Sequence, residues 1–283
     1  MFTWLAPGRL LLDFGPIQAT ITAFRDGKPL EHELEEACAF AEEQLKELVA
    51  YLPFARLTPD AVKETKNFPD ILLKMMDAVK KSGDCDLTSM ATVAGTFSDK
   101  IADFLEGKGA TKVMVSNGGD LAIRLGPGES TKVGIVSDIN DQSFSHVIAI
   151  KEESSIRGIA TSGFGGRSFT KGIASAAVAF GRNCREADAA ATLIANHCFS
   201  PDPGIIQIRA EELDPETDIK GHLVTLSLGE LLPETVDKAL ENGMKKVQEL
   251  MMNETIHGAA FFVGGKSCVL PEDIKQEIQA VRK

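Results

Sequence analysis

Asp188 and Thr192 are the two side chains in this sequence best suited to hold a hard cation together. They lie four residues apart in a segment of helical character, and the residues between them are all alanine. A helix places residues at this spacing on one face, so no bulky side chain would separate the two oxygens from a ligand. A carboxylate and a hydroxyl suit Mg²⁺, which takes its other ligands from water and phosphate. The alternative is a solvated Asp188 and a Thr192 hydroxyl that donates to the Asp188 carbonyl.

The segment Asn117–Asp120, with the sequence NGGD, lies between two apolar runs. One interpretation is a tight hairpin turn, because Asn-Gly is a strong hairpin signal. The other is a turn whose glycines allow a ligand to lie against the main chain. In that interpretation Asp120 accepts hydrogen bonds from the hydroxyls of a ribityl or ribose group.

Residues 160–168 read ATSGFGGRS and form a third candidate. Closely spaced glycines, hydroxyls and Arg167 could together make a nest of N–H groups for phosphate. The alternative is a flexible surface loop. The segment lacks the order G-x-x-x-x-G-K-[ST] of a P-loop, and it is not a dinucleotide-binding fingerprint.

The helices and strands that must position these residues come in blocks of one kind rather than in strict alternation along the chain. Residues 9–24 predict strand, turn and strand, and Ser82-Gly83-Asp84 interrupts a long helical stretch. A second helix is expected from Thr58, with Pro59 at its first position. Such blocks favour an α+β fold with a mixed sheet flanked by helices. Periodicity predicts further helices at 31–51, at 68–105 in pieces, at 184–197 with Asn183 as N-cap, at 233–252 and at the charged C-terminus. It predicts strands at 112–115, 121–125, 132–136, 146–150 and 259–263. Residues 158–168 are expected to form a glycine-rich loop.

Composition limits the classes of function. The 283 residues include 41 Asp and Glu against 30 Lys and Arg, which gives a net charge of −11 and disfavours nucleic-acid binding. A phosphate-bearing ligand would therefore be held by backbone N–H groups or a metal. None of the five cysteines is at C-x-x-C spacing, so buried free thiols are expected. We find no signal peptide and no apolar run of roughly 20 residues, so a cytoplasmic location without a membrane partner is expected.

Four short motifs in one order resemble the ApbE-like family of FAD:protein FMN transferases. That family has an A-K-G-x-x-x-D helix, a G-G-D turn, T-S-G and A-D-A-x-A-T. The corresponding residues here are Ala94-Gly95 with Asp99, Gly118-Gly119-Asp120, Thr161-Ser162-Gly163 and Ala187–Thr192. The resemblance implies a single domain over residues 1–283, with room for two lobes and a core motif region at 89–196.

The resemblance also implies a ligand set. Mg²⁺ would be held by Asp188, Thr192 and the backbone carbonyl near Ala91, and would bridge the pyrophosphate of FAD. FMN would then pass to a Ser or Thr of an acceptor protein. The residues implied to contact the flavin nucleotide, FAD or FMN, are Asn117, Gly118, Gly119, Asp120, Thr161, Ser162, Gly163, Gly165, Gly166 and Arg167.

Two departures from the family pattern leave the activity open. The lysine before the helix glycine is Ala94, and the family's H-I-I-D-P block is replaced by Lys171–Ala176, which contains neither His nor Asp. The chain resembles a distinct prokaryotic branch, some of whose members are associated with sulfur assimilation into homocysteine. Three functions follow: a Mg²⁺-dependent flavin transferase or FAD-cleaving enzyme, a non-catalytic accessory protein with a protein partner, or another phosphoester enzyme with the same metal site. A homodimer is also compatible with the sequence.

Overall fold

The computed structural model describes residues 1–139 and 144–281, which form two compact units made from interleaved stretches of the chain. Within these residues, no helix has both the length and the apolar character needed to cross a membrane. Unit 1 comprises Met1–Thr131, Ile150–Ala160 and Gly181–Ala189, and unit 2 comprises Lys132–Ala149, Thr161–Phe180 and Ala190–Lys283.

Unit 1 contains a large antiparallel sheet in the order β1-β2-β3-β5-β6-β9, with the short β4 paired to β3. In β3, Ile17, Ala19 and Ile21 are buried and Gln18 is exposed, as the alternation in the sequence predicts. The strands are β1 (Phe2–Ala6), β2 (Arg9–Phe14), β3 (Ile17–Arg25), β4 (Lys28–Pro29), β5 (Lys112–Asn117), β6 (Asp120–Leu125) and β9 (Gly158–Ser162), whose first three residues belong to this unit.

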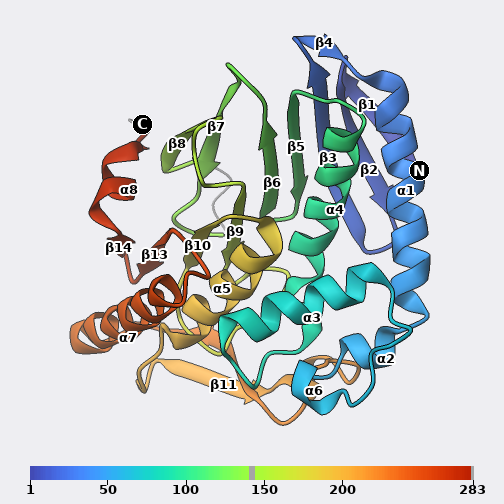
Figure 1. The fold of residues 1–283 in the computed structure, drawn as a ribbon. Coiled ribbons are helices and arrows are strands. Elements are labelled where there is room, and N and C mark those ends of the chain that lie inside the picture. The colour runs from blue at the N-terminus through green and yellow to red at the C-terminus, as the bar shows by residue number, and fades with distance from the viewer. Residues whose placement is uncertain (140–143, 282–283) are drawn as a thin grey trace. The chain divides into compact units, whose positions relative to one another are not determined.

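Helices cover this sheet and close the core of unit 1 (Figure 1). Helix α4 packs on β5 and β6, and α1 packs on β2, β3 and α4. Leu10, Ile21, Leu34 and Leu105, from both layers, are fully buried in one apolar cluster. The helices are α1 (Glu31–Val49), α2 (Leu52–Ala55), the 3₁₀ turn η1 (Pro59–Ala61), α3 (Asp70–Ser82), the 3₁₀ turn η2 (Ser89–Thr92) and α4 (Val93–Gly107).

The helix predicted from Thr58 is wrong, because only the single turn Pro59–Ala61 forms there. The Thr58 side chain makes no cap hydrogen bond, and the chain becomes extended at Val62. The following residues, 63–67, are all polar, so a helix there would have had no apolar face to bury.

Unit 2 contains three sets of paired strands and the long helix α7 (Pro233–Met252). Its strands pair in the orders β10-β13-β14, β11-β12 and β15-β8-β7. Helix α5 (Cys184–His197) contributes Cys184–Ala189 to unit 1 and continues into unit 2. The remaining elements are β7 (Ser130–Ile135), β8 (His146–Lys151), β10 (Ala176–Gly181), β11 (Ile205–Arg209), α6 (Ala210–Leu213), β12 (Leu223–Leu228), α7 (Pro233–Met252), β13 (Gly258–Val263), β14 (Lys266–Leu270), α8 (Glu272–Glu277) and β15 (Ile278–Ala280).

The α+β fold class is confirmed, with antiparallel pairing throughout the registers given above and helices packed on the sheet of unit 1. One further local prediction is wrong. Residues 158–162 form strand β9 rather than part of a loop, because Gly158 and Ile159 pair with β6 and residues 158–160 are buried. The charged C-terminal helix is confirmed as α8, which is short and is followed by β15.

Candidate functional site

Helix α5 begins where its capping residues predict. The Asn183 side-chain oxygen accepts a hydrogen bond from the Glu186 backbone N–H at 2.9 Å. This bond satisfies one of the N–H groups that the first turn of a helix leaves without a partner. The start of α5, which carries Asp188, is therefore fixed by the residue just before it.

Asp99 on α4 holds the same helix start from the side. Its fully buried carboxylate accepts the backbone N–H groups of Cys184 and Arg185, each at 3.0 Å. It also pairs with the side chains of Arg185 and Arg124, again at 3.0 Å each. A buried carboxylate is tolerated when its charge is paired and its lone pairs accept hydrogen bonds, as they do here. Asp99 thus ties α4, β6 and α5 together within unit 1.

Gly95 brings Asp188 against α4. The Gly95 backbone N–H donates to Asp188 Oδ2 at 2.9 Å. A Cβ at position 95 would lie 2.6 Å from the Cys184 carbonyl oxygen and 2.9 Å from the Asp188 Cβ. Only glycine therefore allows this approach. The small residue of the helix motif determines where the Asp188 carboxylate lies.

The Asp188 carboxylate has no cationic partner among the ion pairs formed by residues 1–139 and 144–281. Burial raises its pKa above the usual range, the Gly95 hydrogen bond opposes this shift, and the charge of Asp99 adds to it. The site is thus a partly buried carboxyl group whose charged form has no cationic partner in the described residues. A cation bound there would relieve that energetic cost.

The Asn117–Asp120 segment is a two-residue hairpin turn between β5 and β6, so the hairpin interpretation is confirmed. Gly118 has φ 76°, a left-handed conformation that glycine adopts without steric cost. Asn117 and Asp120 face each other across the turn, and both are buried. The Ser98 hydroxyl donates to the Asp120 carbonyl at 3.3 Å, which links the turn to α4.

Three carboxylates of unit 1 lie near the thiol of Cys184. Burial is the first cause of its raised pKa, and the charges of Asp120, Asp99 and Asp188 raise it further. The hydrogen bonds of Gly95 with Asp188 and of Ser98 with Asp120 connect both motifs to α4. Two motifs far apart in the sequence, around residues 117–120 and 188, therefore lie against the same helix of unit 1.

The Thr161–Arg167 segment belongs to unit 2. Thr161 and Ser162 end β9, and the Phe164 N–H donates to the Ala174 carbonyl at 2.8 Å. The Gly166 N–H donates to the Gly163 carbonyl at 3.2 Å. These two N–H groups are used within the protein, so a phosphate nest at this loop would depend on the remaining ones. The role of the segment in nucleotide binding stays a prediction.

The remaining residues of the predicted metal site are Thr192 and Ala91. Thr192 lies one turn beyond Asp188 on α5, and Ala91 lies in the turn η2. In the described part of the chain, no group of three or more His, Cys, Asp or Glu side chains has a metal-binding arrangement. A carboxylate, a hydroxyl and a carbonyl are the types of donor that suit a Mg²⁺ ion, which takes its other ligands from water and phosphate. The metal site stays a prediction.

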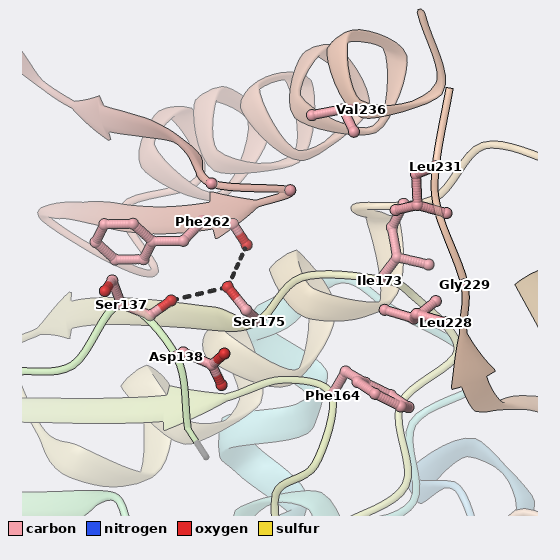
Figure 2. A pocket seen from close by; sticks show the side chains of 12 residues that line it. Ser137, Asp138, Phe164, Ile173, Ser175, Leu228, Gly229, Leu231, Val236 and Phe262 are labelled. Atoms are coloured by element: carbon pink, nitrogen blue, oxygen red, sulfur yellow. Dashed lines mark hydrogen bonds between the residues drawn. The ribbon is translucent and has the colours of Figure 1, made fainter. Parts of the chain in front are cut away.

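Sequence reasoning missed two features. The first is Arg124, which is buried on β6 and bonds to Asp99 and to Asp103. The second is a cavity of about 560 Å³ within unit 2 (Figure 2). Residues from separate stretches of sequence line it, so no local motif could have revealed it. They are Ser137, Asp138, Phe164, Ile173, Ser175, Leu228, Gly229, Leu231, Val236, Phe262, Gly264 and Gly265.

The five cysteines are free thiols, and Cys38, Cys184 and Cys198 are buried as expected. The expectation is wrong for Cys85, which is exposed, while Cys268 is partly buried.

The chain is similar to several known proteins over much of its length. A family model described as AbpE bacteria matches residues 2–269. The UPF0280 protein of Methanosphaera stadtmanae is 32% identical over 127 residues, which are 44% of this chain and 50% of that protein. The UPF0280 protein of Methanospirillum hungatei JF-1 is 30% identical over 167 residues, which are 58% of this chain and 66% of that protein. The matched region thus spans half the length of the first relative.

Among solved structures, the flavin transferase ApbE from Vibrio cholerae is similar with a TM-score of 0.45 and 14% sequence identity. The match covers 66% of this chain and 85% of that chain.

Proposed function

Because the chain belongs to the family described as AbpE bacteria, whose model matches residues 2–269, we propose that it binds a flavin nucleotide, FAD or FMN, together with Mg²⁺. The proposed reaction is transfer of FMN from FAD to a hydroxyl of an acceptor protein, or cleavage of FAD by water. In both reactions the bond from the FMN phosphorus to the bridging oxygen breaks, and AMP leaves with that oxygen. The order of the four sequence motifs supports the choice of nucleotide.

The observation that carries the proposal is the state of Asp188. Its carboxylate belongs to a half-buried residue, accepts one hydrogen bond from Gly95 and has no ion-pair partner in the described residues. The arginines nearest in the network, Arg124 and Arg185, are already paired with Asp99. A carboxylate left in this state is suited to bind a cation rather than to stabilise the fold.

The residues around Asp188 have separate tasks in the proposed function. Gly95 orients the carboxylate by its backbone N–H, and Asp99 fixes the helix on which Asp188 stands. The two glycines of the β5–β6 turn are exposed and would allow a ligand to lie against the backbone, and Asp120 would accept hydrogen bonds from ribityl hydroxyls. Mg²⁺, when bound, would neutralise the negative charge that develops on the pyrophosphate.

The test is isothermal calorimetry with FAD at several Mg²⁺ concentrations, combined with chromatographic detection of FMN and AMP. We expect FAD binding that requires Mg²⁺. In the isosteric variant Asp188→Asn, loss of the charged ligand should weaken that binding about tenfold or more. Unchanged FAD binding in Asp188→Asn would contradict the proposed role of this residue.

The matched control is Asp77→Asn on α3, which removes the same charge from an exposed carboxylate paired with Lys81. FAD binding should be the same in this variant as in the natural sequence. A loss of binding as large as in Asp188→Asn would indicate an effect of net charge and would overturn the assignment.

A second candidate function is binding without turnover, as in an accessory protein. The segment that replaces the family's His and Asp block is used for packing: Ile173 and Ala174 are buried, and Ser175 donates to the carbonyls of Ser137 and Phe262. None of these side chains is a proton acceptor of the His or Asp type. FAD binding without release of FMN or AMP would favour this candidate, whereas release that disappears in Asp188→Asn would exclude it.

A further inference from the structure

We propose that the outer edge of β1 binds the same edge of a second copy of this chain, so that the sheet of unit 1 continues across a two-fold axis. Strand β1 ends the strand order of this sheet, and in the described residues its outer edge has no partner strand (Figure 1). All of its residues, Phe2–Ala6, belong to unit 1. The proposal does not depend on flavin binding.

The backbone of β1 presents hydrogen-bonding groups at this outer edge. The Met1 carbonyl accepts the Asp13 N–H at 3.0 Å, and the same register continues along β1 as far as Trp4. Facing pairs of an antiparallel ladder alternate between hydrogen-bonded and non-hydrogen-bonded, so Met1 and Thr3 are the residues that bond to β2. The N–H and C=O groups of Phe2 and Trp4 therefore point away from β2, toward the open edge.

The sequence of β1 lacks the features that usually protect an exposed edge. Edge strands of folded proteins tend to carry Lys, other charged residues or Pro, which discourage pairing with another chain. Residues 2–6 read FTWLA and contain none of these. The short strand β4 of the same unit, by contrast, consists of Lys28 and Pro29. Strand β1 is thus open to pairing with a further strand.

The order of residue types around Thr3 favours a second copy as the partner. Phe2 and Trp4 flank Thr3, and the apolar Met1 and Leu5 come next on either side, so the segment reads alike in both directions. An antiparallel copy centred on Thr3 would set Phe2 against the partner's Trp4 and the two Thr3 residues against each other. Aromatic pairs and Thr–Thr pairs are favourable across strands. A surface that matches itself in this way is what a two-fold interface requires.

The same pairing would cover apolar side chains that unit 1 leaves exposed. Phe2 and Trp4 lie opposite Leu12 and Leu10, which are fully buried in the core, so their rings are on the core face of the sheet. The two rings are in edge-to-face contact with centroids 6.1 Å apart, yet the residues are 37% and 38% exposed. On the opposite face, Leu5 is 51% exposed. Pairing of two copies would bring four aromatic rings together and extend the apolar layer across the axis.

The overlap of the two strands is short. The register of β1 shifts between Trp4 and Ala6, and Pro7 follows, so regular pairing is limited to residues 1–5. An interface built around such a segment is smaller than the ~1,600 Å² of a typical stable complex. We therefore expect a reversible dimer with a dissociation constant in the micromolar range.

Sedimentation equilibrium and fluorescence of the full chain test the proposal together. We expect a monomer–dimer equilibrium across the micromolar range. Trp4 is the single tryptophan of the chain, so its emission reports on this edge alone. Dilution that dissociates the dimer should shift the emission to the red, because the ring becomes more exposed to water. A chain that stays monomeric at every concentration, or a dimer that dissociates without a change in emission, would overturn the proposal.

A charge placed on the edge locates the interface. Phe2→Lys should weaken the dimer by about tenfold or more, because a lysine on an edge strand opposes pairing. The matched control is Leu73→Lys on α3, at a position that is 41% exposed. It makes the same change of charge and should leave the dissociation constant unchanged. Equal weakening in both variants would refute the assignment to β1.

A disulfide across the axis tests the register. The two Thr3 residues would form a non-hydrogen-bonded pair, whose Cα atoms lie about 4.5 Å apart, within the range that a disulfide bridges. In a Cys85→Ser background, which removes the exposed natural thiol, Thr3→Cys should form a covalent dimer with oxidised glutathione as the oxidant. Leu73→Cys in the same background should remain unlinked. No covalent dimer of Thr3→Cys, or equal linkage of the two variants, would contradict the proposed pairing.

Discussion

The absence of a Cβ atom at Gly95 allows α4 and α5 to approach each other closely. The Cβ that any other residue would add lies closer than normal contact distance to the Cys184 carbonyl oxygen and the Asp188 Cβ. The neighbours are backbone and the root of a side chain, which cannot rotate away. The same glycine supplies the N–H group that Asp188 accepts. Packing and orientation of the carboxylate therefore depend on one missing methyl group.

Gly95→Ala should lower the free energy of unfolding by about 1–3 kcal/mol, because the added methyl overpacks a close helix contact. It should also move Asp188 and so weaken Mg²⁺-dependent FAD binding. The measurements are urea unfolding and calorimetry.

The matched control is Gly107→Ala at the end of the same helix, where an added Cβ has no atom within 4 Å. Alanine there should raise the free energy of unfolding by roughly 0.5 kcal/mol, because it restricts the unfolded chain and favours the helix. Equal effects of the two substitutions would show that the contact at Gly95 is not tightly packed.

The contacts of some side chains could be predicted from the sequence, whereas those of others could not. The cap formed by Asn183 could be predicted because capping is local and depends on a three-residue spacing. The pairing of Arg124 with Asp99 could not, because it joins residues of β6 and α4 whose contact exists only in the folded chain. The alanines and Thr192 that follow Asp188 in the sequence indicated it as a candidate metal ligand. That Asp188 has no ion-pair partner in the described residues could be learned only from the structure.

At the level of elements, the start of α7 shows how one carboxylate positions a helix. Asp202 accepts hydrogen bonds from Thr235 and from the backbone N–H groups of Gly204 and Leu232, and these bonds hold its pKa below the usual range. Negative charge near a helix N-terminus is also favourable because the helix dipole is positive there.

Asp202→Asn and Asp202→Ala should both lower the melting temperature at neutral pH, by a few degrees in the case of alanine. A group with a lowered pKa in the folded state stabilises the protein above its unfolded pKa, here 3.8, and that contribution is lost as the pH falls through the folded value. The difference in melting temperature between the natural chain and Asp202→Asn should therefore shrink below about pH 4. A difference that is constant from pH 7 to pH 3 would contradict this account.

The elements themselves were predictable where burial follows a simple period. The β3 strand and helices α1, α3 and α7 have one apolar face, which a period of two or of 3.6 residues reveals. Strand β10 was missed because its residues are all buried and show no alternation. Strand β9 was mistaken for part of a loop because its glycine and hydroxyl residues have weak strand propensity, and pairing with β6 outweighs that preference.

On the scale of the whole molecule, the chain passes repeatedly between its two units. Unit 1 needs Ile150–Ala160 and Gly181–Ala189 in addition to its first 131 residues. The first of these segments supplies the start of β9, which pairs with β6, and the second supplies the start of α5, which Asp99 caps. Neither unit corresponds to one continuous stretch of sequence.

A fragment of residues 1–131 should therefore not unfold cooperatively. It would leave one side of β6 unpaired and would leave the buried Asp99 without the N–H groups of Cys184 and Arg185. A fragment of residues 1–189 contains all three stretches of unit 1 and should recover a cooperative transition, measured by circular dichroism during heating. A sharp transition in the shorter fragment would show that unit 1 does not need its later segments.

This interleaving also has a consequence for biosynthesis. After Thr131 has been added, the ribosome must still polymerise roughly sixty residues before Ala189 exists, which takes several seconds at ~5–20 residues per second. During that time the nascent polypeptide presents an open strand edge at β6, the kind of surface that invites aberrant pairing with other chains. Molecular chaperones that bind nascent chains would find their target in this interval, and slow translation between these two points would lengthen it.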